Sequence, residues 1–206
     1  MYIPKIYRNN DVGEILEFIR QNSFAQLISV SDNLPIASHL PIMLRSDKDQ
    51  HYLHGHMARA NPQWKSFASQ KAMVIFNGPH SYISSSWYDH VNVPTWNYIA
   101  VHVYGTIRII DGDELYQSLK TLTAHFEATQ EKPVSVEGMS DYVRAQMKGV
   151  VGFEIQVEKL EGKWKMSQNR DEKNYIAVIS QLEKINDANS QAVASIMKAR
   201  GFNNEL

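Results

Sequence analysis

The sequence predicts an α+β fold in which a small, mostly antiparallel β-barrel carries peripheral helices. Three β-rich runs follow one another between residues 24 and 57, with connections short enough for hairpins. A later run, Val151–Leu160, alternates apolar and polar residues as a half-buried strand does. Amphipathic stretches near both ends of the chain supply helices to cover such a sheet.

The first third of the chain predicts one helix followed by three strands. Apolar residues recur at helical spacing over 11–21, and the side chain of Asp11 suits an N-cap. Phe24–Val30, Ile36–Leu44 and His51–Met57 are then expected to be strands. Pro41 cannot donate to a β-ladder, so we expect an edge position or a bulge there.

The middle of the chain predicts a short helix, a buried strand and a long loop. Asn61–Ser69 is expected to be helical, with Asn61 as N-cap and Pro62 at the first position. Ala72–Phe76 is a short apolar run typical of a buried strand. Asn77–Asn97 is rich in aromatic and polar residues and is expected to be a long functional loop.

The second half predicts a further strand and several helices. Tyr98–Ile110 is expected to be a long strand with a bulge at Gly105. A helix should start at Asp111 or Asp113 and end near Thr129, and 130–147 should contain a second, shorter one. The tail predicts two amphipathic helices separated near 186–189. We interpret residues 1–206 as a single domain with a C-terminal helical segment from about residue 171.

Composition excludes several classes of function. The 21 Lys and Arg residues balance 22 Asp and Glu residues, so no global charge attracts nucleic acid or an anionic membrane. The absence of cysteine excludes disulfides, thiolate metal sites and a cysteine nucleophile. The N-terminal residues lack the apolar core of a signal peptide, and no run approaches the ~18 apolar residues of a membrane span. A soluble, cytoplasmic protein is expected.

No common catalytic signature is present, and we assign no catalytic residue. The chain has no G-x-S-x-G, P-loop, G-x-G-x-x-G or H-E-x-x-H motif. His54 and His56 would share one face of a strand, where two imidazoles could ligate a metal. Spacing supplies no third ligand, so hydrogen-bonding roles are favoured and no metal site is expected.

Three short runs combine polar groups with aromatic residues. In 53–64, Arg59 lies just before the helix start at Asn61, which suits a phosphate, although a surface ion pair is the simpler alternative. The aromatic residues of 78–98 suit a planar heteroaromatic ligand or, equally, a structural loop. The cationic run 163–170 could hold an anion or form a solvated turn.

The same runs, taken in order, carry a family resemblance over almost the whole chain. They are SHLPI (38–42), GHMARANPQW (55–64), IFNGPHSYISSSWY (75–88), VPTWNYIAVHVYG (93–105) and KMSQNR (165–170). With these motifs the chain resembles the PaiB family, which is described as FMN-binding negative transcriptional regulators. It departs from the family at Ser84-Ser85-Ser86, where members commonly carry a proline, and this change loosens the loop backbone.

The resemblance implies an FMN-binding split β-barrel, similar to the pyridoxamine-phosphate-oxidase-like group, that forms a homodimer with flavin at the subunit interface. The strand with His39 and Leu40 would run beside the isoalloxazine ring. The segment 56–61 would approach the ribityl phosphate, with Arg59 as the first phosphate contact. The implied cofactor-binding residues are His39, Leu40, His56, Arg59, Asn61, Tyr82, Trp96, Asn97, Tyr98, Lys165 and Gln168.

Three functions are compatible with these features. The family implies a flavin-binding regulator or sensor, and a flavin barrel equally suits a flavin-dependent oxidoreductase. A haem-handling split-barrel protein ranks last, because no histidine is marked out as an axial ligand. The tail helices, 171–200, carry four cations against four acids, whereas an element that contacts DNA normally clusters cations. We therefore expect any regulation to be indirect or to need a partner.

Overall fold

The computed structural model describes residues 1–67 and 70–202, and these fall into two compact units. The barrel unit comprises Leu16–Phe76 and Val103–Leu160. The terminal unit comprises Met1–Ile15, Asn77–His102 and the chain from Glu161 onward. Three long strands pass from one unit into the other, and each unit is described by itself below. In the described part of the chain, no helix combines the length and the apolar character needed to cross a membrane.

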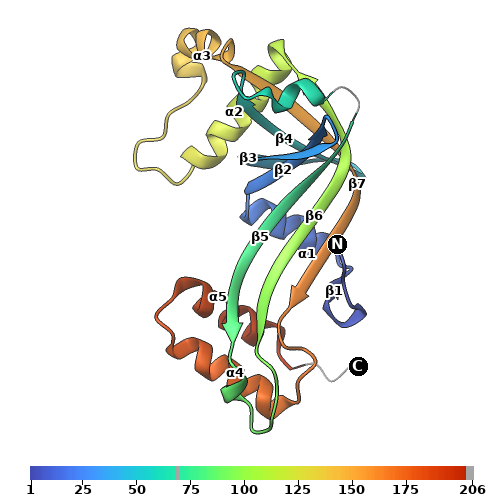
Figure 1. The fold of residues 1–206 in the computed structure, drawn as a ribbon. Helices are drawn as coiled ribbons and strands as arrows, with labels where there is room; N and C mark the ends of the chain where they lie inside the picture. The colour runs from blue at the N-terminus through green and yellow to red at the C-terminus, as the bar shows by residue number, and fades with distance from the viewer. Residues whose placement is uncertain (68–69, 203–206) are drawn as a thin grey trace. The chain divides into compact units, whose positions relative to one another are not determined.

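The strands form a mostly antiparallel sheet that closes on itself (Figure 1). The order is β1-β7-β4-β3-β2-β5-β6, and β6 pairs back on β7, which completes a ring. This arrangement confirms the predicted α+β fold built on a barrel. The strands are β1 (Arg8–Asn9), β2 (Phe24–Ser31), β3 (Leu34–Asp47), β4 (Gln50–Ala58), β5 (Lys71–Ile83), β6 (Thr95–Ile110) and β7 (Val150–Lys165).

The core of the barrel unit follows from the alternation of side chains along these strands. Phe67 and Phe153 are fully buried and meet edge to face, with ring centroids 5.8 Å apart. At Gly105 a Cβ atom would lie 2.0 Å from the carbonyl oxygen of Gln156, so the glycine admits the backbone of β7. Further fully buried members of this core are Leu27, Ile42, Leu53, Val74, Phe76, Ile107 and Ile155.

Pro41 lies where β3 changes partners. Residues 34–41 of β3 pair with β2, whereas Ile42 and the residues after it pair with β4. Pro41 therefore lies in a stretch of β3 that pairs on one side only, as the expected edge position requires, although β3 as a whole is interior in the sheet order. Because the β4 pairing starts only at Ile42, the missing N–H of Pro41 leaves no gap in that ladder.

The predicted helices are present, with one change of type. The side chain of Asp11 accepts a bond from the Glu14 N–H (3.0 Å) at the start of the first helix. The helix predicted after Asn61 is a short 3-10 turn that ends at Ser66, and its expected end at Ser69 lies outside the described residues. The α-helices are α1 (Val12–Gln21), α2 (Gly112–Glu127), α3 (Ser140–Met147), α4 (Glu172–Lys184) and α5 (Ala188–Arg200), and the 3-10 turns are η1 (Lys5–Tyr7), η2 (Pro62–Ser66), η3 (Ser85–Trp87) and η4 (Glu137–Met139).

The long loop predicted over Asn77–Asn97 is wrong at both of its ends. β5 continues to Ile83, and β6 begins at Thr95, so the loop is confined to 84–94. The strand runs without a break through Gly78 and Pro79. The pairing of β5 with β6 is a long-range contact that local sequence does not reveal, and here it overrides the turn signals.

In the terminal unit, α4 and α5 lie side by side as the antiparallel pair that ends the chain (Figure 1). Their shared face buries Tyr175, Val178, Leu182, Val193 and Met197. The Tyr175 hydroxyl donates to the carbonyl of Met197 (2.8 Å) and joins the two helices. The helical tail expected from about residue 171 is thus a packed pair of helices.

Candidate functional site

His39 lies on an exposed, largely apolar face of the β2–β3 hairpin. Opposed residues of an antiparallel pair share a face, and His39 is opposed to Gln26. Around it the outer face of the hairpin carries Phe24, Ile28, Val30, Pro35, Ala37 and Pro41. The Phe24 side chain is 66% exposed, and its ring stacks on that of His39 with centroids 6.3 Å apart. Leu40 is opposed to the buried Ala25 and therefore faces the barrel interior.

Asn61 belongs to a hydrogen-bonded cluster beneath this hairpin. Its carbonyl oxygen accepts from the Gln63 N–H (3.0 Å), and its Nδ2 donates to the Ser38 hydroxyl (2.8 Å). Gln63 is fully buried and donates from Nε2 to the carbonyls of Leu27 and Ile36, each at 3.1 Å. The polar groups of Asn61 thus hold η2 against the barrel. Sequence reasoning did not single out Gln63 or Ser38.

Arg59 is held by the backbone that leads into β7. Its Nε donates to the carbonyl of Lys148 (2.8 Å), and its Nη2 donates to that of Val150 (2.9 Å). The guanidinium also lies 5.9 Å from the ring centroid of Trp64. Carbonyl partners do not neutralise the charge, and no carboxylate among the described residues pairs with Arg59. The alternative of a surface ion pair is therefore not observed.

His56 borders an apolar cavity of about 340 Å³ in the barrel unit. The cavity is lined by side chains from α2, α3 and their neighbours, among them Leu119, Leu122 and Val143. Burial lowers the pKa of His56 below its ordinary value, so the neutral imidazole is favoured there. A neutral ring matches its apolar surroundings.

His54, on the same strand face, contacts a buried carboxylate. Its Nε2 lies 2.8 Å from Oε2 of Glu154, and both side chains are buried. Arg108 donates from Nε to the other oxygen of Glu154 (2.8 Å) and also pairs with Glu114. Among the described residues, no group of three His, Asp or Glu side chains could hold a metal ion.

In the terminal unit, Tyr82, Trp96 and Lys165 lie together. The Tyr82 and Trp96 rings meet edge to face at 5.9 Å, and the Trp96 side chain is 52% exposed. Lys165 donates to the carbonyl of Trp96 (2.8 Å) and to the hydroxyl of Thr95. This pair of exposed rings beside an ammonium group can contact a planar anionic ligand.

Asn97 and Gln168 use their polar groups inside the terminal unit. Asn97 is fully buried, and its amide exchanges two hydrogen bonds with the Ser167 hydroxyl (3.0 and 3.1 Å). Gln168 accepts from the Met166 N–H (2.6 Å) and donates to the carbonyl of Trp164 (2.5 Å). Both residues therefore shape the turn after β7. Gln168 also borders a cavity of about 520 Å³.

Tyr98 contacts a buried cation. The Lys163 ammonium lies 5.1 Å from the Tyr98 ring centroid and donates to the carbonyl of Tyr2 (3.3 Å). Lys163 is only 8% exposed, so this ring supplies much of its local environment. Tyr98 thus stabilises a charge that is largely shielded from water.

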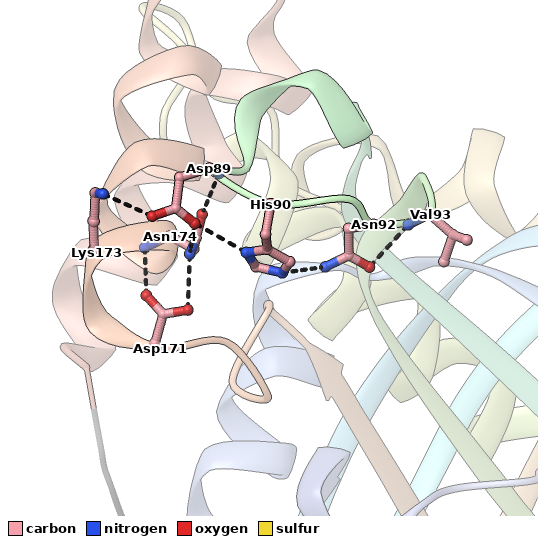
Figure 2. Close-up of polar contacts among 7 residues, drawn as sticks. All are labelled: Asp89, His90, Asn92, Val93, Asp171, Lys173 and Asn174. Carbon is pink, nitrogen blue, oxygen red and sulfur yellow. Dashed lines mark hydrogen bonds and ion pairs between the residues drawn. The ribbon is translucent and has the colours of Figure 1, made fainter.

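The loop 84–94 is tied to the start of α4 through Asp89 (Figure 2). Asn174 donates from Nδ2 to Asp89 (2.9 Å) and to Asp171 (2.8 Å), while its carbonyl oxygen accepts from the Asp89 N–H (3.1 Å). Lys173 adds an ion pair with Asp89 at 2.7 Å. Hydrogen bonds from Lys173, His90 and Asn174 hold the pKa of Asp89 well below its usual range. The carboxylate therefore stays ionised and fixes the loop.

Residues 1–159 match the family model described as "Putative FMN-binding domain". The chain is 41% identical over 200 residues to "Protease synthase and sporulation protein PAI 2" of Bacillus subtilis, covering 96% of this chain and 97% of that protein. An uncharacterized protein of Emericella nidulans is 29% identical over 245 residues and is matched over 98% of each chain.

Solved structures share the fold at low sequence identity. The FAD and heme binding protein from Mycobacterium smegmatis superposes with a TM-score of 0.61 at 16% identity, over 83% of this chain and 79% of that one. The flavocytochrome Anf3 from Azotobacter vinelandii gives 0.58 at 13% identity, over 85% and 78% of the two chains. These likenesses agree with the split-barrel architecture.

Proposed function

Because the chain belongs to the PaiB family of FMN-binding proteins, we propose that it is an FMN-binding regulator similar to PaiB-type negative transcriptional regulators, acting without autonomous DNA binding. The cofactor is FMN, in line with the family model that matches residues 1–159. That match is the observation that carries the proposal. We further propose that residues 1–206 form one PaiB-like domain and that the protein is cytoplasmic.

The residues present fit a flavin. The outer face of the β2–β3 hairpin offers a flat apolar surface with His39 in it, which suits an isoalloxazine ring. Arg59 keeps its charge and one terminal nitrogen beyond its carbonyl contacts, which suits a phosphate. Bound FMN would supply hydride or single-electron transfer. In the barrel unit we propose His39, the backbone of Leu40, His56 and Arg59 as flavin contacts, with Asn61 as a positioning residue. In the terminal unit, by the family resemblance, we propose the candidate contacts Tyr82, Trp96, Tyr98, Lys165 and Gln168, with Asn97 as a positioning residue.

A homodimer with flavin at its interface is part of the proposal. Apolar residues dominate the outer face of the hairpin, where Phe24 is 66% and Val30 is 47% exposed. A contiguous exposed apolar face on a sheet favours a covering partner. A second copy of the chain covers two such faces at once, because a two-fold interface is self-complementary.

Ion pairs in the tail helices support indirect regulation. Of the four cations in 171–200, Lys173 pairs with Asp89, Lys198 with Glu183 and Arg200 with Glu14. A helix that contacts DNA needs its cations free to meet phosphates. The pairing of these side chains therefore favours a packing role for α4 and α5.

Absorbance of the freshly purified protein, followed by FMN titration, tests the cofactor. We expect one FMN per chain and an affinity about tenfold weaker in Arg59→Ala, since a charge-assisted contact is lost. Lys65→Ala, an exposed lysine of η2, is the matched control. Absence of FMN binding at micromolar concentration would overturn the cofactor assignment.

Two further measurements separate the regulator from its alternatives. Catalytic reoxidation of FMN after reduction by NADH or NADPH would make the protein a flavin-dependent oxidoreductase. A tight, sequence-specific and steeply salt-dependent shift of DNA by the purified protein would contradict the absence of autonomous DNA binding. The regulator we propose shows neither.

A further inference from the structure

The end of β7 and the turn after it carry cations that have no carboxylate partner. Lys163, Lys165 and Arg170 form no ion pair with any residue that the structure describes. Three acids of the adjoining segments make their contacts elsewhere: Glu161 pairs with the N-terminal amine, Asp89 with Lys173, and Asp171 accepts hydrogen bonds from Asn174. Three neighbouring cations therefore lack a direct carboxylate partner.

Aromatic rings hold these cations in place. The Arg170 guanidinium lies 4.7 Å from the Tyr88 ring centroid, and the Lys165 ammonium lies 6.0 Å from that of Tyr7. Cation–π contacts stabilise a cation without using its N–H donors or neutralising its charge. The Arg170 guanidinium has no hydrogen-bond partner among the described residues, whereas Lys165 bonds to the Thr95 hydroxyl and the Trp96 carbonyl and keeps its third N–H.

Several donors in this cluster lack a partner. Nε of Arg170 and the hydroxyl of Tyr88 are buried without a hydrogen bond, and Tyr88 is only 8% exposed. No described residue bonds to the Tyr7 hydroxyl or to the other guanidinium nitrogens of Arg170. Buried polar groups in folded proteins nearly always have a partner, so these orphans require an explanation.

The same groups influence one another electrostatically. Burial, Lys163 and Arg170 together lower the pKa of Lys165, and no carboxylate opposes that shift. Burial raises the pKa of Tyr7, and both Arg170 and Tyr88 act on its hydroxyl. Tyr7, Tyr88, Lys165 and Arg170 thus lie within range of one another, and we call them the Tyr7–Arg170 cluster.

We propose that the Tyr7–Arg170 cluster binds an oxyanion, either a phosphate or a carboxylate group. The cluster combines a guanidinium and an ammonium group with two phenol hydroxyls that can donate, and it contains no carboxylate, which is the chemistry that such an anion requires. The anion can be free in solution, or it can be the phosphate of FMN, in which case the site rests on the proposed function and takes the role given there to Arg59. Free phosphate and the phosphate of FMN present the same tetrahedral oxygens to the cluster.

Calorimetric titration of the full chain with inorganic phosphate, at fixed ionic strength, tests the site directly. We expect one phosphate per chain, bound about tenfold more weakly by Lys165→Met and measurably more weakly by Tyr88→Phe. Tyr88→Phe removes only an unpartnered hydroxyl and should leave the fold intact. Lys184→Met, an exposed lysine of α4, is the matched control and should bind as the wild type does.

Parallel titrations with FMN and riboflavin identify the source of the anion. If Lys165→Met abolishes the preference for FMN over riboflavin, the site takes the flavin phosphate. If Lys165→Met still prefers FMN over riboflavin but no longer binds phosphate, the site takes a separate anion. Either of these two results supports the proposal. Phosphate affinity unchanged in both variants, or no phosphate binding by the wild type, overturns it. If the wild-type chain binds phosphate but does not bind FMN, the proposed function is overturned and the anion site is not.

Discussion

The guanidinium of Arg170 stacks on the ring of Tyr88, 4.7 Å from its centroid, although 82 positions separate the two residues in the chain. The next residue after each, Asp171 and Asp89, accepts a hydrogen bond from the same amide, that of Asn174 (Figure 2). Asn174 therefore sets the distance between the loop that carries Tyr88 and the turn that carries Arg170. By binding Asp89 and Asp171, Asn174 brings the Tyr88 ring and the Arg170 guanidinium together.

Asn174→Ala should destabilise the protein and disturb this stacking. Asn174 is 2% exposed, and its loss leaves the Asp89 N–H without a partner and removes one hydrogen bond from each of the Asp89 and Asp171 carboxylates. Each buried group left unpaired costs about 1–3 kcal/mol, so urea unfolding should show a loss in this range. Asn169→Ala, at an exposed position in the same turn region, is the control. Equal stability of the two variants would contradict the role given to Asn174.

Gln63→Leu should be among the most destabilising polar substitutions in the barrel unit. The leucine keeps approximate volume but removes donors to the carbonyls of Leu27 and Ile36 and the acceptor of the Ser38 hydroxyl. We expect the free energy of unfolding to fall by about 2 kcal/mol or more. Gln130→Leu, at an exposed position after α2, should change it by less than about 0.5 kcal/mol. A small effect at Gln63 would mean that water replaces its amide.

Local sequence patterns predicted the helices and most strands, because those depend on periodicity and caps. The N-caps Asp11 and Asn61 were visible as short polar side chains before apolar periodic runs. The extension of β5 to Ile83 was not visible, since Gly78 and Pro79 signal a turn and only pairing with β6 overrides them. The alternation along Val151–Leu160 puts Glu154 on the polar face of that strand, whereas the structure buries it against His54 and Arg108.

The candidate site residues are predicted for two different reasons. Arg59 and the 163–170 run stand out by charge, and Tyr82 and Trp96 by aromatic content, so composition alone marks them. Sequence could not show that Asn97 is fully buried and bonded to Ser167, nor that Gln63 joins β2 to β3. These roles depend on contacts between residues far apart in the chain. Only the fold defines which polar side chains remain free for a ligand.

Phe24→Glu should weaken the homodimer that we propose. The substitution places one carboxylate from each copy in the apolar outer face of the hairpin, where neither would have a cationic partner. We expect dimerisation to weaken by about tenfold or more, measured by size-exclusion chromatography with light scattering. Val91→Glu introduces the same charge at a fully exposed apolar residue of the 84–94 loop and should remain dimeric. A wild type that is monomeric at all concentrations would contradict the interface.

His56 should make the protein less stable as the pH falls. Its folded pKa lies below the unfolded value of about 6.5, because the apolar cavity disfavours the imidazolium form. Between those two pKa values the unfolded chain binds more protons than the folded one, so stability rises with pH across that window. The contribution of His56 is therefore complete above pH ~6.5 and is lost on acidification toward its folded pKa. His56→Leu removes the titration and suits the leucine and valine lining of the cavity. Urea unfolding at a series of pH values should show a flatter acid limb in this variant than in the wild type.

His56→Gln separates titration from packing, because it also removes the titration but keeps a polar side chain. If both variants flatten the acid limb, titration of His56 is the cause, whereas a wild-type profile in both would show that His56 is not desolvated in the fold.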